Sequence, residues 1–187
     1  SSTLSPAFLS NFSKDAPENI TMIDAPMSGA PMRAKDATLT FMVGAEKNEY
    51  QDILPILNIL GEKIYHIGQF GSGMSVKVLN NFVASCSVVA VRHVLSEAKH
   101  LNITSDQLLE ILNCSSGKTW FSENLESIDW SKESYAKENT IGILEKDVNS
   151  YLDGLKHSGS ETNRAMLNFQ QTLLNGLRNI PDFPNDD

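Results

Sequence analysis

The sequence predicts an α/β segment followed by an all-helical region that is built on one long helix. Two observations support this fold class. Before about Phe70, short β-branched and aromatic runs lie between Pro and Gly residues, with one helical pattern among them. After Phe70 these runs stop, and apolar residues recur at helical spacing with no Pro before Asn102. We therefore expect two parts, residues 1–70 and residues 71–187.

The first part reads as strand, helix, strand. The expected strands are Asn19–Pro26, Ala37–Ala45 and Lys63–Gly68. Between the second and third, the segment Glu46–Gly61 places its apolar residues three and four apart, which predicts a helix. A strand, a helix and a second strand in succession are typical of an α/β unit.

The second part begins with a helix that Ser72 or Ser75 can cap and that runs for close to thirty residues. Its middle is apolar nearly all round, so we expect other helices or a second subunit to bury it. Three more helices are predicted within Thr104–Asn113, Ser134–Gly159 and Glu161–Leu177.

Composition excludes several classes of partner and site. A net charge of -8 argues against nucleic acid as a partner, because such binding rests on Lys and Arg. We find no apolar run long enough to span a bilayer and no targeting pattern, so we expect no membrane partner and a cytoplasmic location. Cys86 and Cys114 lie far apart without a CxxC pattern, so no metal site is predicted. The chain starts at Ser1, so we expect a trimmed, processed or fragmentary chain.

The stretch GSGMSVKVLNN, Gly71–Asn81, joins the two parts. It lacks the third glycine of a dinucleotide fingerprint and the GK[ST] of a P-loop, so phosphate binding is not predicted. Lys77 and Asn81 lie four apart, on one face of the helix near its start. There the helix dipole is expected to depress the lysine pKa. From spacing alone, a solvated surface lysine beside a capping-region asparagine is the commoner interpretation.

Two further segments carry candidate chemistry. Ser28 and Gly29 follow a predicted strand, where a hydroxyl and an open backbone amide can hold a carboxylate. An ordinary turn explains the same pair, and more often. The stretch LEKDV, Leu144–Val148, places a charged pair on an amphipathic helix, where a solvated face is the simpler interpretation.

Taken together, four segments resemble the β-hydroxyacid dehydrogenase family, and they occur in the order found in that family. They are SSTLSP at Ser1, DAPMSGAPMRAKDATLTFMVGA from Asp24, GSGMSVKVLNN from Gly71, and EKD at Glu145. They are spread over most of the chain, so together they are far more specific than any one alone.

The resemblance implies a role for each matched residue. Lys77 is then the catalytic lysine that takes the proton of the substrate hydroxyl as hydride leaves the carbon. Asn81 orients the substrate. Ser28, Gly29 and Ala30 are expected to anchor the substrate carboxylate. Lys146, with Asp147 beside it, is expected to contact the cofactor. Thr3 is expected to lie near the nicotinamide ribose.

The resemblance also implies the organisation of the protein. Residues 1–70 correspond to the C-terminal part of a Rossmann-type nucleotide-binding domain, and residues 71–187 to a helical dehydrogenase and dimerisation domain built on a long interdomain helix. The family acts on small hydroxy acids with NAD or NADP. The long apolar helix favours a homodimer through contacts of the helical domain. No GxGxxG occurs in this chain, so we expect it not to bind the cofactor alone.

Two residues depart from the family pattern. The family has Ser-Gly-Gly where this chain has Ser-Gly-Ala, and the methyl group of Ala30 narrows the anchor. With Arg33, the segment PMRAKDATL resembles that of family members that act on polyhydroxylated four-carbon acids. Two alternatives stay open: a non-catalytic dimerisation or interaction module derived from the family, and an unrelated helical binding domain. Retention of Lys77, Asn81 and Lys146 favours the enzyme.

Overall fold

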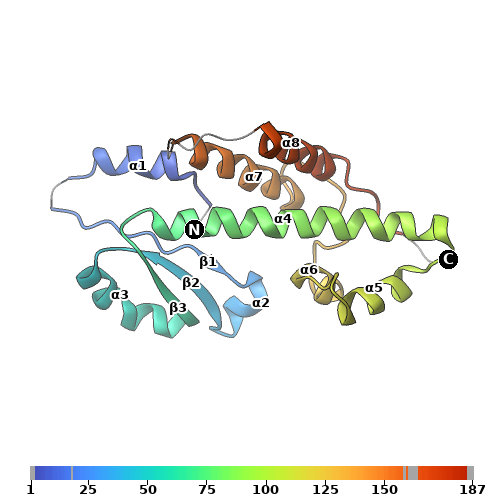
Figure 1. Ribbon diagram of the computed structural model, residues 1–187. Helices are drawn as coiled ribbons and strands as arrows, with labels where there is room; N and C mark the ends of the chain where they lie inside the picture. Colours follow the sequence, from blue (N-terminus) through green and yellow to red (C-terminus); the bar gives the residue numbers. More distant parts are fainter. Residues whose placement is uncertain (1–2, 18, 158, 160–163, 185–187) are drawn as a thin grey trace. The chain divides into compact units, whose positions relative to one another are not determined.

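The computed structural model describes residues 3–17, 19–157, 159 and 164–184 (Figure 1). The chain divides into two compact units, which are described separately below. Unit 1 comprises Ser1–Asn80 and Asn149–Glu161, and unit 2 comprises Asn81–Val148 and Thr162–Asp187. Two helices contribute residues to both units. The predicted boundary between residues 1–70 and 71–187 stays a prediction.

Unit 1 contains a small mixed sheet in the order β1-β2-β3. β1 (Met27–Ser28) is antiparallel to β2 (Leu39–Gly44), and β3 (Gly61–Gly68) is parallel to β2. Helix α3 (Lys47–Leu60) makes the crossover that two parallel strands require. The core of this layer consists of Leu39, Phe41, Val43, Ala45 and Leu57.

The first predicted strand, Asn19–Pro26, is wrong over most of its length. Only Asp24 pairs there, in an isolated antiparallel bridge with Gly44, and the ladder resumes at β1 after Pro26. Proline has no N–H, so Pro26 can only accept, and its carbonyl does so from the Met42 amide at 3.0 Å. Pro26 thus interrupts the ladder between Asp24 and Met27, and residues before Asp24 lie beyond Gly44, where β2 ends.

Two short helices in unit 1 were not predicted. Helix α1 (Pro6–Lys14) starts at Ser5, whose hydroxyl accepts the Phe8 amide, and Pro6 occupies the first helical position. Helix α2 (Ala30–Lys35) follows β1 directly. The Ser-Pro start signal was available in the sequence, but α1 has only nine residues, too few for a clear hydrophobic period.

The long helix is confirmed. Helix α4 spans Ser72–Ala98, continues as the 3₁₀ turn η1 (Lys99–Leu101), and ends where Asn102 turns left-handed at φ 58°. Its residues belong to unit 1 up to Asn80 and to unit 2 from Asn81. The predicted burial of its middle holds on one face only, because Phe82, Val88 and Leu95 are buried while Val83 is 65% exposed.

Among the described residues, one helical stretch, Ser72–Leu101, is long and apolar enough to cross a membrane by length and composition. The expectation that the chain holds no such apolar run is therefore wrong. One such helix is weak evidence for a membrane, because core helices of soluble proteins have the same properties. Arg92, in its second half, is fully buried and donates to the backbone carbonyls of Ser131, Glu133 and Pro181.

The regular elements in the described part of unit 2 are helices, and they are joined by loops such as residues 128–139. It holds α5 (Ser105–Cys114), α6 (Trp120–Glu123), the 3₁₀ turn η2 (Leu125–Ser127), and α8 (Arg164–Arg178). Helix α7 (Thr140–His157) starts six residues later than predicted, and it contributes its residues up to Val148. The predicted fold class is confirmed: a small α/β part is followed by helices.

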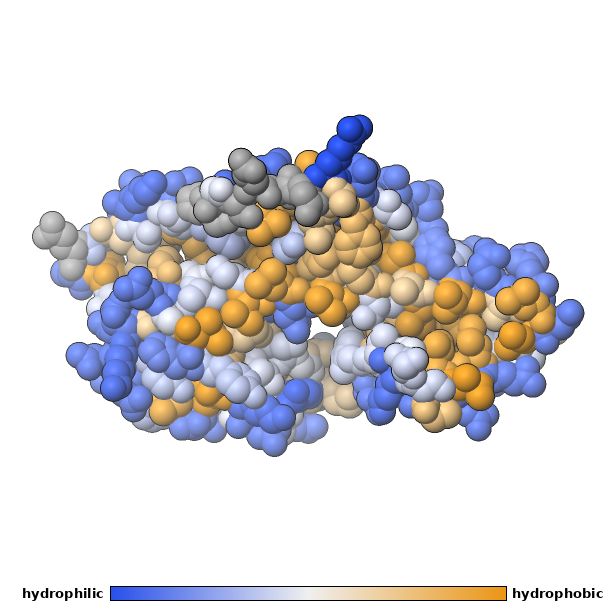
Figure 2. Space-filling view, in the orientation of Figure 1, coloured by the Kyte–Doolittle hydropathy of each residue, from blue (hydrophilic) through white to orange (hydrophobic). Residues whose placement is uncertain are grey.

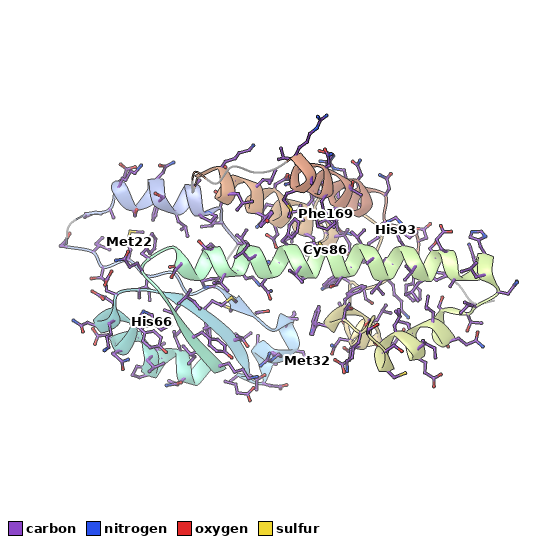
Figure 3. The ribbon with its side chains drawn as sticks, in the orientation of Figure 1. Met22, Met32, His66, Cys86, His93 and Phe169 are labelled. Carbon is purple, nitrogen blue, oxygen red and sulfur yellow. The ribbon has the colours of Figure 1, made fainter. Side chains whose placement is uncertain are left out.

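Aromatic and polar contacts hold α8 against α4 and α7 within unit 2. The Phe169 ring, labelled in Figure 3, meets the Phe82 ring edge-on with 5.8 Å between centroids. The buried Gln170 amide donates to the Val148 carbonyl at 3.1 Å. These contacts set the surroundings of the α4 turn that carries Asn81.

Candidate active site

The start of α4 is held by a carboxylate from 47 residues earlier in the chain. Asp24 accepts the Gly71 amide on Oδ1 at 2.6 Å and the Met74 amide on Oδ2 at 2.5 Å. Free amides at a helix N-terminus are what an external phosphate would bind. Two of them are already taken here by an internal anion, which is the physical reason that this glycine-rich loop is a poor phosphate site.

The two glycines of the loop have separate tasks. Gly71 has φ +91°, and nothing lies within 4 Å of the position of a Cβ there, so it is needed for backbone conformation. A Cβ on Gly73 would lie 2.2 Å from the Met42 carbonyl oxygen, so it is needed for contact with β2. The loop therefore seats the first turn of α4 directly on the sheet.

Asp24 is a buried acid, 6% exposed. Burial raises the pKa of its carboxyl above the ordinary value, and the amide donors of Gly71 and Met74 oppose that rise. Its own backbone exchanges two hydrogen bonds with Gly44, at 2.8 and 3.0 Å. The side chain thus connects an extended segment of the sheet to the helix that carries Lys77.

The predicted cofactor segment lies against the same helical turn. The Leu4 amide, next to Thr3, donates to Sδ of Met74 at 3.4 Å. Met74 is buried, and its own amide is one of the two that Asp24 accepts. Unit 1 therefore joins the segment of Thr3, the segment of Asp24 and the turn before Lys77 through direct hydrogen bonds.

The predicted carboxylate anchor follows β1 in a strained conformation. Gly29 has φ +142° and Ala30 has φ +57°. A Cβ on Gly29 would lie 2.8 Å from Cβ of Arg33, so only glycine fits. The left-handed Ala30 occupies the position where the family has its second glycine, and an alanine is strained there.

Arg33 pairs with a carboxylate of the sheet. Its Nη2 lies 3.4 Å from Oε2 of Glu62 on β3, and both side chains are more than a third exposed. This surface ion pair contributes little to stability.

In unit 2, Asn81 is held by the charged pair predicted on the later helix. Its Nδ2 donates to Oδ2 of Asp147 at 2.7 Å, and Asp147 is only 3% exposed. A carboxylate can only accept, so this bond fixes which way the Asn81 amide points. Nζ of Lys146 lies 3.8 Å from Oδ1 of Asp147, with 45% of the lysine side chain exposed.

Each unit thus gathers part of the predicted site. Lys77 and Asn81 lie on α4 one turn apart. Unit 1 holds Thr3, Ser28, Gly29, Ala30 and Lys77, and unit 2 holds Asn81 and Lys146. The sequence did not identify Asp24 as part of the site, although it lies in the DAPMSG segment. The contact between Asn81 and Asp147 could not be predicted from the sequence, because the two residues lie 66 positions apart in the chain.

Thr3 is half-buried in unit 1, and the Lys146 side chain is 45% exposed in unit 2; the cofactor role of each stays a prediction. At the start of α4, Asp24 already accepts the Gly71 and Met74 amides, so these two amides are not available to a diphosphate. Within the described residues no group of three His, Cys, Asp or Glu side chains could hold a metal ion.

Family models match nearly the whole chain. Residues 1–68 match the NAD binding domain of 6-phosphogluconate dehydrogenase. Residues 71–179 match the NAD-binding domain of NADP-dependent 3-hydroxyisobutyrate dehydrogenase.

Individual proteins agree with these models. The mitochondrial 3-hydroxyisobutyrate dehydrogenase of Drosophila melanogaster is 36% identical over 66% of this chain and 38% of its own length. The 2-(hydroxymethyl)glutarate dehydrogenase of Eubacterium barkeri is 34% identical over 65% of this chain and 41% of its own length. The chain therefore spans about 40% of the length of these relatives. The Mycobacterium tuberculosis 3-hydroxyisobutyrate dehydrogenase structure with L-serine has a TM-score of 0.75 at 22% identity, covering 98% of this chain and 65% of that one, which shows a common fold.

Proposed function

Because the chain belongs to the β-hydroxyacid dehydrogenase family, we propose that the protein interconverts a small 3-hydroxy acid and its aldehyde with NAD(P). One observation carries the proposal beyond family membership. The Asp24 carboxylate ties the first turn of α4, three residues before Lys77, to the segment that leads into Ser28 and Gly29. The proposed proton acceptor and the proposed carboxylate anchor are thus joined within one unit.

Lys77 is the proposed acid and base. In the oxidation direction its neutral Nζ takes the proton from the substrate hydroxyl, while the hydrogen on the same carbon leaves as hydride and the C–O bond becomes C=O. The nicotinamide, when bound, supplies the hydride acceptor.

Ser28 and Gly29 form the proposed carboxylate anchor. A hydroxyl and an open amide can both donate to a carboxylate oxygen, which fixes the substrate at its unreactive end. Ala30 adds a methyl group beside that anchor and narrows it. Asn81 orients the hydroxyl end, and Lys146 and Thr3 contact the cofactor in this proposal.

The substrate class follows from the named relatives. Both 3-hydroxyisobutyrate and 2-(hydroxymethyl)glutarate contain HOCH₂–CH(R)–COO⁻. A serine hydroxyl and backbone amides that bind the shared carboxylate leave R unspecified, so we propose a 2-substituted 3-hydroxypropanoate.

The decisive experiment compares Lys77→Ala with the wild type in the complete protein encoded by the gene. Reduction of NAD⁺ and of NADP⁺ is followed at saturating 3-hydroxyisobutyrate, 2-(hydroxymethyl)glutarate and L-serine. We expect loss of about 10²- to 10⁴-fold in kcat, the usual contribution of an acid-base group. Lys99→Ala, an exposed lysine in η1 just after α4, is the matched control and should keep its activity. An unchanged rate in Lys77→Ala would exclude the role given to that lysine.

The 187-residue chain alone is proposed to have little nicotinamide affinity, because its sequence lacks a GxGxxG unit. Isothermal titration of the chain with NAD⁺ and NADP⁺ tests this. Micromolar affinity would contradict it.

A homodimer through the helical part is proposed from the exposed apolar residues of unit 2. Val83, Val94 and Leu101 are each at least 45% exposed along α4 and η1, and Figure 2 shows further hydrophobic residues over α5. Sedimentation of the Val83→Glu, Val94→Glu double variant tests this. We expect a monomer from it and a dimer from the wild type.

A further inference from the structure

We propose that Asp24 is a positioning residue for the dehydrogenase reaction, an inference that rests on the function proposed above. Its carboxylate fixes the first turn of α4, and therefore Lys77, relative to the carboxylate anchor at Ser28 and Gly29. Asp24 touches neither substrate nor cofactor in this proposal. It acts through the backbone amides that it accepts.

The geometry of Asp24 leaves it little freedom. Its backbone N–H and C=O are both bonded to Gly44, and its two carboxylate oxygens are bonded to two different amides of one helical turn. Four hydrogen bonds therefore join the extended segment, β2 and α4 at one residue. Ser28 lies only four residues further along that segment.

The space around Asp24 is equally restricted. A Cβ on Gly44 would lie 2.0 Å from Oδ1 of Asp24, and a Cβ on Gly73 would lie 2.2 Å from the Met42 carbonyl oxygen. Each of these two glycines leaves room for a contact between the sheet and the start of α4. Helix α4 therefore cannot slide along β2 without breaking the Asp24 bonds.

Met74 extends the same arrangement to the predicted cofactor segment. Its amide donates to Asp24, and its sulfur accepts the Leu4 amide next to Thr3. Lys77 follows Met74 by three residues, so the two lie on the same side of α4. One carboxylate thus organises three segments that the proposed reaction uses.

An anion is required at this position for two reasons. A carboxylate accepts both amides, whereas an asparagine would place its own NH₂ group against one of them. The charge also complements the positive end of the helix. Without it we expect the first turn to shift, and a shift of about 1 Å in a catalytic group can cost on the order of 10²-fold in rate.

The test compares Asp24→Asn and Asp24→Ser with the wild type in the complete protein. In Asp24→Ser one hydroxyl oxygen can still accept a hydrogen bond, and no NH₂ group faces the backbone amides. This variant replaces Asp24→Asn in the test if the asparagine variant does not fold. Leu57→Ala is the control: it removes a buried side chain of the unit 1 core on α3, away from α4. We expect kcat to fall about 10- to 100-fold in the Asp24 variants with the hydroxy-acid KM within about threefold, the pattern of a displaced catalytic group. Leu57→Ala should lower the Tm but keep its kcat.

Hydrogen exchange of the Gly71 and Met74 amides is measured on the same samples. Loss of protection at these amides, together with the fall in kcat, supports the proposal. If the Asp24 variants lose protection at these amides but keep the wild-type kcat, the proposal is overturned. It is also overturned if Leu57→Ala, at the same Tm as an Asp24 variant, loses as much kcat as that variant. If the wild type oxidises no 3-hydroxy acid, the proposed function fails. Positioning by Asp24 is then judged by amide exchange, and full protection in Asp24→Asn overturns it.

Discussion

Removal of the Asp147 carboxylate tests whether Asn81 needs a fixed orientation. Asp147 is almost fully buried in unit 2 and accepts the Asn81 amide at 2.7 Å. In Asp147→Ala that donor loses its charged acceptor. We predict that turnover falls while the fold is retained.

The size of the effect follows from the type of bond. A hydrogen bond to a charged group contributes about 1.5–3 kcal/mol. At about 1.4 kcal/mol for each factor of ten, this corresponds to roughly 10- to 150-fold in kcat/KM if the whole bond serves the transition state. The short distance and low exposure favour the upper part of that range.

The assay measures kcat/KM of the complete enzyme with its preferred hydroxy acid, with the Tm recorded for each variant. Asp147→Asn should lose less than Asp147→Ala, because its carbonyl oxygen can still accept from Asn81. Asp153→Ala, an exposed acid on the same helix, is the matched control. A loss below threefold in Asp147→Ala would refute the reasoning that Asp147 orients Asn81.

Three further predictions concern stability. Arg92→Ala should lower the free energy of unfolding in urea by about 3–5 kcal/mol, because three carbonyls lose a buried charged donor; a loss below 1 kcal/mol would contradict this. Ala30→Gly should raise it by about 0.5 kcal/mol, since relief of the left-handed strain exceeds the entropy of glycine; a decrease would count against it. Arg178, and then Tyr135, hold the pKa of Glu145 below its ordinary 4.5, so Glu145 stabilises the fold above that pH and less as the pH falls through its lowered pKa. Glu145→Gln should therefore lower the Tm at pH 7, and the difference should shrink below pH 4.5, whereas a constant difference would be inconsistent.

Local patterns in the sequence predicted the elements that depend on local interactions. The long α4 helix follows from uninterrupted helical spacing, and β2 and β3 follow from their β-branched runs. The strand expected over Asn19–Pro26 is wrong for two reasons. Pro26 has no N–H and interrupts the ladder between Asp24 and Met27, and the partner strand β2 ends at Gly44, which pairs with Asp24. Helix α1 was missed because nine residues give only a short amphipathic pattern, although Ser5 and Pro6 are a regular start signal.

The candidate site divides in the same way. The i, i+4 relation of Lys77 and Asn81 is local, so the sequence alone gives it. The bonds from Asp24 to Gly71 and from Asn81 to Asp147 span 47 and 66 residues, and no periodicity reports them. The sequence places Asp24 and Asp147 in motifs, but their hydrogen-bond partners follow only from the fold.

The glycine-rich loop before α4 shows why such a motif does not identify a ligand. Its amides form a site for an anion, and in this chain the anion is Asp24. The absence of a side chain at Gly73 lets the helix pack directly on β2, and its absence at Gly44 leaves room for the Asp24 carboxylate. The amides of Gly71 and Met74 instead hold the start of the helix that carries Lys77, and the proton transfer proposed for that lysine requires such a fixed position.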